Sequence, residues 1–247
     1  VTQAVPDATV TVQREYIHAL DGFALQAPAS SLQAIRNTEG VKTAFVEQTY
    51  DPAPINEERD DAEAMTAALR AADPTLRNSS SLEMIRANET AYKGDRLVIE
   101  IIDTGVSTDH PAFAGSMDGI DVRLREEDIA TLVSKLPNGS GGRYVSKKIP
   151  FAYDYGERDD DARPDWGPNV AHGTHVAGIA AANGAELRGV APNAQIIVAK
   201  ASVAGQGIVD SAVLEALDDA LILKPDVINL SLVRQGGMSS EAGSVYD

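Results

Sequence analysis

Three short apolar segments constrain the fold of this chain more than any other feature. Residues 97–102, 195–200 and 226–232 are rich in β-branched side chains, and Glu100 is the one charge inside the first segment. Nearly continuous apolar runs of this length are typical of strands buried on both faces of a parallel sheet. Between the second and third segments, apolar residues recur at helical spacing from Ile208 to Leu221. Strands that alternate with helices predict an α/β domain, a parallel sheet flanked by helices.

The first 52 residues have a different pattern and are predicted to form a small α+β domain. An alternating stretch at 9–17 and a turn at Asp21-Gly22 predict a β-hairpin with 23–26. A short helix is expected around Leu32 and Ile35, with Ser30 or Ser31 as N-cap and a stop at Gly40. A strand pattern follows at 41–46.

A change of composition separates this front domain from the rest of the chain. Residues 53–80 contain prolines, an acidic run at 57–61, an alanine-rich piece and three serines at 79–81, so we interpret them as a linker. Residues 81–247 then form the α/β domain. Within it, the polar and glycine-rich stretch between Asp103 and His172 is expected to be a surface insertion.

Composition excludes several kinds of function. There are 37 acidic against 21 basic residues, a net charge of −16, so nucleic acid is not an expected partner. The absence of cysteine excludes disulfides, thiol catalysis and thiolate metal sites. No run reaches the roughly 18 apolar residues that span a bilayer. The chain begins at Val1 without a signal-peptide pattern, so we expect any such leader to be absent or already missing.

Asp103 is the first candidate functional residue, because it ends the buried strand at 97–102. In open α/β sheets the functional crevice lies at the carboxyl ends of the strands. An aspartate before glycine is also common as a turn or cap residue. The triplet Asp103-Thr104-Gly105 occurs in aspartic proteases too, which need a second carboxylate. No second triplet is present here, although a dimer could supply one.

The stronger signal is the stretch 172–178, which reads HGTHVAG and is followed by small residues. Glycine and alanine remove side-chain bulk, so a helix here can lie close against the sheet. His172 would then stand at the helix N-terminus, facing the strand ends and Asp103. A buried aspartate that orients an imidazole makes it a general base.

Two other interpretations of the histidines remain. His172 and His175 can be core or capping residues, and we expect His175 to be a packing residue. A metal site would need a third ligand or the glutamate of a zinc-protease helix, and neither stands nearby in the sequence. No metal and no cofactor are therefore predicted.

Four motifs occur in order along residues 82–232. They are the IIDTGV stretch at 101–106 with Asp109-His110-Pro111, the histidine stretch, GVAP at 189–192 and DVINLSL at 226–232. Together they resemble the subtilisin family of serine proteases. The resemblance implies that Asp103 is the triad aspartate and His172 the triad base. It also implies that residues 1–52 are an inhibitory propeptide that occupies the enzyme's own cleft. The 69 positions between Asp103 and His172 resemble the lactocepin and C5a-peptidase branch of cell-envelope proteases.

The family binds extended peptides between two edge segments, and this implies a set of substrate-binding residues. The matching positions are Gly205, Gln206, Gly207, Ser231 and Leu232. Val233 stands where the family usually has glycine, which predicts a narrowed pocket or a displaced strand. Ala112 replaces an acidic residue expected in the family's calcium site, so no calcium is assigned.

The family's nucleophile motif, of the type Gly-Thr-Ser-Met-Ala, does not occur in these 247 residues. We therefore expect the serine to lie outside this chain and the chain itself to be inactive. The interpretation is a secreted or cell-wall-associated serine endopeptidase precursor acting on protein or peptide substrates. The alternative is a pseudoprotease without a nucleophile that binds peptides or inhibits a protease.

Overall fold

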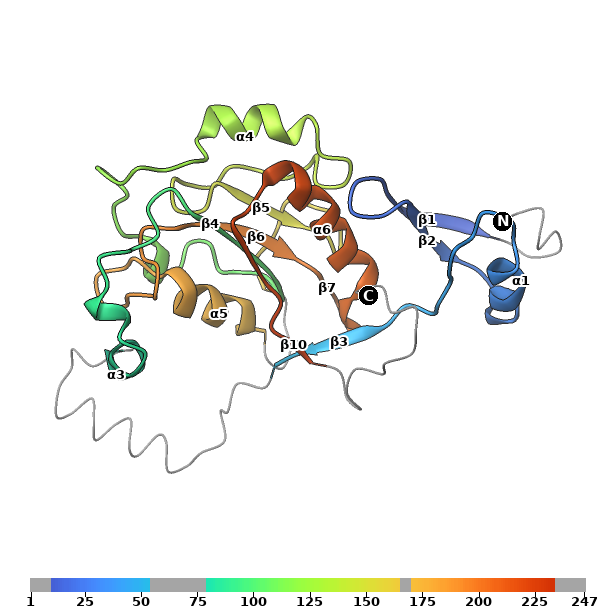
Figure 1. Cartoon of the computed structure of the whole chain (residues 1–247), viewed down its shortest axis with the longest axis horizontal. Coiled ribbons are helices and arrows are strands. Elements are labelled where there is room, and N and C mark those ends of the chain that lie inside the picture. The colour runs from blue at the N-terminus through green and yellow to red at the C-terminus, as the bar shows by residue number, and fades with distance from the viewer. Residues whose placement is uncertain (1–9, 54–78, 165–169, 234–247) are drawn as a thin grey trace, which may run out of the picture.

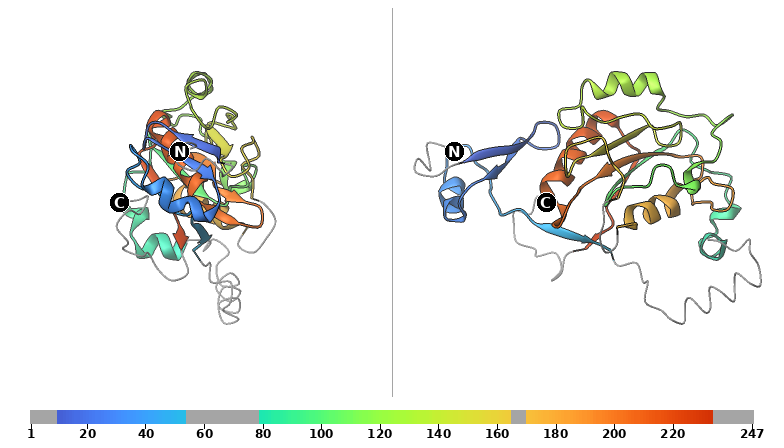
Figure 2. Two further views of the ribbon diagram at one scale, coloured as in Figure 1. Left: turned by 90° about the vertical axis from the view of Figure 1, so that its right-hand side faces the viewer. Right: turned by 180° about the vertical axis from the view of Figure 1, so that it is seen from behind.

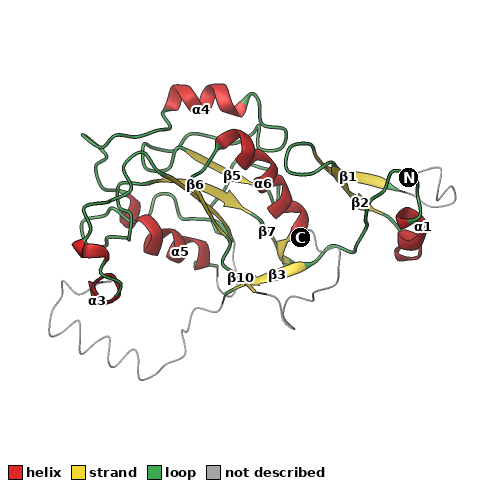
Figure 3. Cartoon of the chain, viewed as in Figure 1, coloured by secondary structure: helices red, strands yellow, loops and turns green. Residues whose placement is uncertain are grey.

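A four-stranded parallel sheet forms the centre of the molecule, in the order β5-β6-β4-β9. The computed structural model describes residues 10–53, 79–164 and 170–233 (Figure 1). The strands of this sheet are β4 (Val98–Asp103), β5 (Phe151–Asp154), β6 (Gln195–Lys200) and β9 (Val227–Asn229). Helices flank the sheet (Figure 3), which confirms the predicted α/β class.

The two faces of the sheet pack against different helices, α5 (His172–Ala181) and α6 (Asp210–Leu223). Side chains of β4 alternate between them, because successive residues of a strand point to opposite faces. Ile101 packs in one apolar cluster with Ala177 and Ala181 of α5. Val98 and Ile102 pack in the other cluster with residues of α6. Asp103 ends β4 on the α5 face.

The front unit, residues 10–53, begins at one side of this body, and its last residues run along the body and join it as a strand (Figures 1 and 2). The predicted hairpin forms, with β1 (Thr11–Tyr16) antiparallel to β2 (Gly22–Gln26). The predicted helix is α1 (Leu32–Arg36), which ends before Gly40 and follows a 3-10 turn at Ala29–Ser31.

The prediction of a strand at 41–46 is wrong. These residues have no regular structure, and Phe45 and Val46 are 38% and 61% exposed, because no strand lies beside them. A strand forms instead just after this segment, as β3 (Thr49–Pro52), where other strands lie beside it. The proposed linker at 53–80 lies mostly outside the described residues.

A second, smaller sheet has the order β10-β3-β8-β7. Its other strands are β7 (Ser202–Val203), β8 (Gly207–Val209) and β10 (Leu232–Val233). The segment predicted as one strand at 226–232 is thus divided between β9 in the central sheet and β10 in this one. Likewise, the first two residues of the predicted helix, Ile208 and Val209, belong to β8.

The stretch between Asp103 and His172 is more than a surface insertion, and that interpretation is corrected. It contributes β5, an edge strand of the central sheet, and Ile149, Phe151 and Tyr155 are 0% exposed. The strand is only four residues long and ends in an aspartate, so its pattern is too short to stand out. The other elements are α3 (Ser79–Met84), α4 (Glu126–Val133) and 3-10 turns at Ala87–Glu89 and Pro111–Phe113.

None of the helices in the described ranges is long and apolar enough to cross a membrane.

Candidate active site

The carboxyl edge of the central sheet brings Asp103 and His172 together. Asp103 is the last residue of β4, and His172 is the first residue of α5. Their side chains are 0% and 4% exposed, and 2.7 Å separates Oδ1 of Asp103 from Nδ1 of His172. With Asp103 ionised, Nδ1–H donates this hydrogen bond, and Nε2 remains the basic nitrogen of the ring.

Close contact between helix and strand depends on Gly173, the second residue of α5. A Cβ added there would lie 2.3 Å from the carbonyl oxygen of Gly105 and 3.1 Å from Cβ of Asp103. Any other residue would force the helix away from the strand end. Gly178, the other glycine of the motif, has only Leu187 at 3.9 Å, so it is not the residue that limits this approach.

Thr104 ties the two elements together and was not singled out from the sequence. Its hydroxyl donates to the carbonyl of Val170 (3.1 Å) and accepts from the N–H of Gly173 (3.1 Å). A second threonine, Thr174, accepts from the N–H of Ser107 at 2.9 Å. Both threonines belong to the motifs, and their polarity inside small apolar stretches is the signal that could have identified them.

Burial raises the pKa of Asp103 above its ordinary value, while hydrogen bonds from His172 and from the N–H of Thr104 lower it. The N–H of Thr104 lies 2.7 Å from Oδ1. Oδ2 is buried and has no hydrogen-bond partner among the residues that the structure describes. The carboxylate is therefore held mainly through one oxygen, the one that faces the imidazole.

A second buried charge pair lies along the same edge of the sheet. Lys200 is in register with Asp103 on one side and with Asp154 on the other. Nζ of Lys200 lies 2.6 Å from Oδ2 of Asp154, and both side chains are at most 2% exposed. Sequence patterns did not reveal this pair, because a lysine at the end of an apolar strand normally reaches solvent.

The predicted substrate-binding residues lie on both sides of β3. Tyr50 of β3 pairs with Ile208 of β8, directly after Gly205-Gln206-Gly207. On the other side, Pro52 pairs with Leu232, and the N–H of Ala53 donates to the carbonyl of Ser231 at 3.0 Å. The two predicted edge segments therefore hold an extended piece of this same chain.

Gly207 allows β8 to lie close to β3, whereas Gly205 has open space around it. Gly205 and Gly207 have positive φ values of 73° and 84°, and a Cβ on Gly207 would lie 2.9 Å from the carbonyl oxygen of Tyr50. Val233, where the resemblance led us to expect glycine, remains in its strand and pairs with Asp51.

His175 is not the packing residue that was expected. It is exposed, whereas His172 is buried. Across the described ranges, no group of three or more histidine, aspartate or glutamate side chains is arranged to hold a metal ion.

Acidic residues of α6 were also missed by sequence reasoning. Glu215, Asp218 and Asp219 are at most 1% exposed, although their spacing on a helix is typical of a solvated face. Asp218 accepts the backbone N–H groups of residues 17–19 at 2.6–3.1 Å, and Asp210 accepts that of Gln48 at 2.8 Å. The front unit therefore covers Asp210 and Asp218, whereas Asp219 accepts from the N–H of Gly139 and the hydroxyl of Tyr155.

Comparisons with known proteins agree with this architecture. Residues 94–247 match the model of the subtilase family, Peptidase S8. The PI-type proteinase of Lactococcus lactis subsp. cremoris is 27% identical over 236 residues, 92% of this chain and 11% of that protein. The minor extracellular protease Vpr of Bacillus subtilis (strain 168) is 28% identical over 227 residues, 90% of this chain and 24% of Vpr.

The chain belongs to the subtilase family, whose model covers more than half of its residues. Its relatives include the PI-type and PIII-type proteinases of Lactococcus lactis subsp. cremoris, as the resemblance to the lactocepin branch predicted. The subtilisin-like protease SBT2.1 of Arabidopsis thaliana is 30% identical over 60% of this chain and 20% of that protein. This chain therefore spans only a small part of the length of these relatives.

Proposed function

We propose that this chain is the front part of a serine endopeptidase precursor in which Asp103 and His172 are two members of an Asp-His-Ser triad. The observation that carries the proposal is the 2.7 Å hydrogen bond between these two buried side chains at the carboxyl edge of the sheet. Subtilase membership supports it. The serine of the proposed triad lies outside this chain, so the chain alone is inactive.

The proposed chemistry is acyl transfer. Asp103 holds the ring of His172 with the proton on Nδ1, and Nε2 removes the proton of the serine hydroxyl. The serine oxygen attacks the peptide carbonyl carbon, and His172 returns the proton to the departing amine as the C–N bond breaks. Water then hydrolyses the acyl-enzyme in the same way.

We further propose that residues 1–52 are the propeptide, residues 53–80 a linker and residues 81–247 the first part of the catalytic domain. In this proposal β3 occupies the place of a peptide substrate, between β8 and β10. Backbone pairing on both sides supports it, because proteases bind extended peptides through main-chain hydrogen bonds. The precursor would act on protein or peptide substrates, secreted or bound to the cell wall, as the name of its extracellular relative Vpr suggests.

Labelling of the full-length protein with a serine-directed fluorophosphonate tests the proposal. Wild type should be labelled, and His172→Ala should be labelled on the order of 10³-fold more slowly or not at all, because the serine loses its base. His175→Ala, an exposed histidine in the same motif, is the matched control and should be labelled like wild type.

Absence of labelling in the full-length wild type would favour the alternative, a pseudoprotease that binds peptides or inhibits a protease. The seating of β3 between β8 and β10 is the observation that fits this second function, since it needs no nucleophile.

A further inference from the structure

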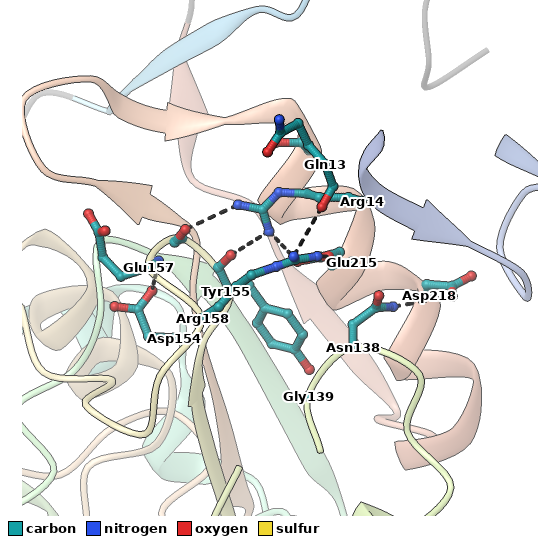
Figure 4. A network of polar contacts seen from close by, with 12 residues as sticks. Gln13, Arg14, Asn138, Gly139, Asp154, Tyr155, Glu157, Arg158, Glu215 and Asp218 are labelled. Carbon is teal, nitrogen blue, oxygen red and sulfur yellow. Dashed lines mark hydrogen bonds and ion pairs between the residues drawn. The ribbon is translucent and has the colours of Figure 1, made fainter. Parts of the chain in front are cut away.

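The front unit and α6 meet around a buried carboxylate that two arginines share (Figure 4). Glu215 of α6 has a side chain that is only 1% exposed. One carboxylate oxygen accepts from Nη1 of Arg14 on β1, and the other accepts from Nη2 of Arg158. Arg158 belongs to the turn 154–159, which follows β5. A single acid therefore connects three segments of the chain.

Each arginine also donates to backbone carbonyls of the segment that carries the other arginine. Arg14 donates to the carbonyls of Tyr155 (2.6 Å) and Gly156 (3.1 Å), both in the turn. Arg158 donates to the carbonyl of Gln13 in β1, at 3.0 Å. The guanidinium of Arg14 thus meets one carboxylate and two carbonyl oxygens, an arrangement that matches its planar fork of donors.

The turn 154–159 is built rigidly enough to hold these carbonyls in place. Asp154 accepts the N–H of Glu157 at 3.0 Å, and residues 154 and 159 form an antiparallel bridge. Glu157 accepts the N–H of Ala204 at 2.9 Å, which ties the turn to the hairpin of β7 and β8. The same turn therefore contacts β1 of the front unit and the hairpin that pairs with β3.

Apolar packing contributes little to this contact. Val12 and Ile17 are each 56% exposed, and Tyr16 is the buried apolar residue of β1. A cleft of about 260 Å³ remains between residues 12–17 and the side formed by Pro137, Asn138 and Arg158. Polar contacts consequently carry most of the attachment at this end of the front unit.

Among those polar contacts, Arg14 is the charged side chain that forms an ion pair with α6, whereas the carboxylate of Glu47 accepts the backbone N–H of Ser211 at 3.0 Å. From the front unit Asp218 accepts only backbone N–H groups, which every residue except proline offers, and its further contact is with the side-chain amide of Asn138 at 3.4 Å. The pairing of β3 with its neighbours is also a backbone contact. Tyr16 adds one neutral hydrogen bond, from its hydroxyl to the carbonyl of Ser211 at 3.2 Å.

We propose that Glu215 and the carbonyls of Tyr155 and Gly156 form an arginine-binding site that selects this chain's own front unit through Arg14. Arg158 completes the site from the other side. That this site holds an inhibitory propeptide rests on the proposed function. That it binds the front unit through Arg14 does not. Without Arg14, β1 leaves α6 even while β3 stays paired.

Amide hydrogen exchange of the whole chain, followed by mass spectrometry, tests this site. Arg14→Met should raise exchange in residues 11–19 on the order of a hundredfold, since Glu215 loses one partner of a buried ion pair. Arg14→Lys should fall between this variant and wild type, because an ammonium cannot reach the carboxylate and both carbonyls together. Arg158→Met should also raise exchange in 11–19.

Arg96→Met is the matched control, because Arg96 pairs with Asp121 on the surface and its side chain is 64% exposed. This variant should exchange like wild type in residues 11–19. Equal exchange in Arg14→Met and Arg96→Met would overturn the proposal. A rise in β4 and β6 as large as that in β1 would overturn it too, because the whole fold rather than the front unit would then be opening. Neither result depends on the fluorophosphonate experiment, so the two proposals can fail separately.

Discussion

The two faces of the central sheet use buried charge in different ways. On the α5 face, Asp103 meets His172 through one hydrogen bond, and both residues stand in short motifs of small residues. On the α6 face, Glu215 and Asp218 each accept from groups about 200 positions away in the front unit, and Arg158 and Asn138 complete their contacts. The proposed catalytic pair is built from two local motifs, whereas the contact with the front unit requires segments that only the complete fold assembles.

The largest effect is expected from removing the contact between Asp103 and His172 on the α5 face. Asp103→Asn in the full-length protein should lower kcat on the order of 10⁴-fold, because the imidazole loses the acceptor that selects its tautomer. Kinetics with a peptide substrate measure this. Asp109→Asn, an exposed aspartate of the same stretch, should leave kcat unchanged. An equal loss in both variants would mean that Asp103 has no special role.

The α6 face should give the chain a marked pH dependence of stability. Burial, with repulsion from Asp219, raises the pKa of Glu100 from 4.5 to about 8, and both its oxygens are without hydrogen-bond partners in the described residues. Because the folded pKa lies above the unfolded one, the fold favours the protonated form. Glu100 therefore does not lower the free energy of unfolding below about pH 4.5. As the pH rises towards 8, it lowers this free energy progressively, by on the order of 4 kcal/mol.

Glu100→Leu should remove most of this decrease, which urea unfolding between pH 5 and 8 measures. Some dependence should remain, since burial also raises the pKa of Asp219 to about 6. Glu126→Gln, an exposed glutamate of α4, should behave like wild type. A variant Glu100→Leu that loses as much stability as wild type over this range would contradict the assignment.

A smaller effect is expected from the second charge pair on the α5 face. Lys200→Met leaves Asp154 buried without its ammonium partner and should cost roughly 3 kcal/mol of the free energy of unfolding. The double variant Lys200→Met with Asp154→Asn should recover part of that loss, because the unpaired charge is gone. Urea unfolding at neutral pH compares the two. A double variant that is less stable than the single one would contradict this explanation.

The smallest effect is expected at an exposed ion pair, which serves as the reference for the buried pairs. Arg96→Met removes the contact with Asp121, whose side chain is 56% exposed, and should change the free energy of unfolding by less than about 0.5 kcal/mol. A loss comparable to that of Lys200→Met would show that burial is not what separates these pairs.

Much of the central sheet could be predicted because its strands carry a strong local pattern. The segment 195–200 is β6 residue for residue, and α5 begins at His172 as expected. The strand β5 was missed because four residues ending in aspartate do not form a recognisable apolar run. The strand expected at 41–46 failed for the opposite reason, since a strand pattern without a neighbouring strand has nothing to pair with.

The same contrast holds for the functional residues: local motifs identified some of them and missed others. Motifs with glycine at contact positions, such as Gly173 beside Asp103, identified the pair at the sheet edge. Nothing local identified Arg14, Glu215 or the turn at 154–159, because arginine and glutamate on a strand or helix are normally solvated. Their burial results from contacts between distant segments.

By itself, the sequence determined the α/β class, the subtilase resemblance and the two residues at the edge of the sheet. Periodicity and glycine-rich motifs are local, so they can be read without knowing what lies nearby in space. Only the tertiary structure decided that β3 inserts between β8 and β10 and that Glu215 and Asp218 of α6 are buried against the front unit. The physical reason is that backbone pairing and burial of charge depend on partners far away in the chain, which no local pattern specifies.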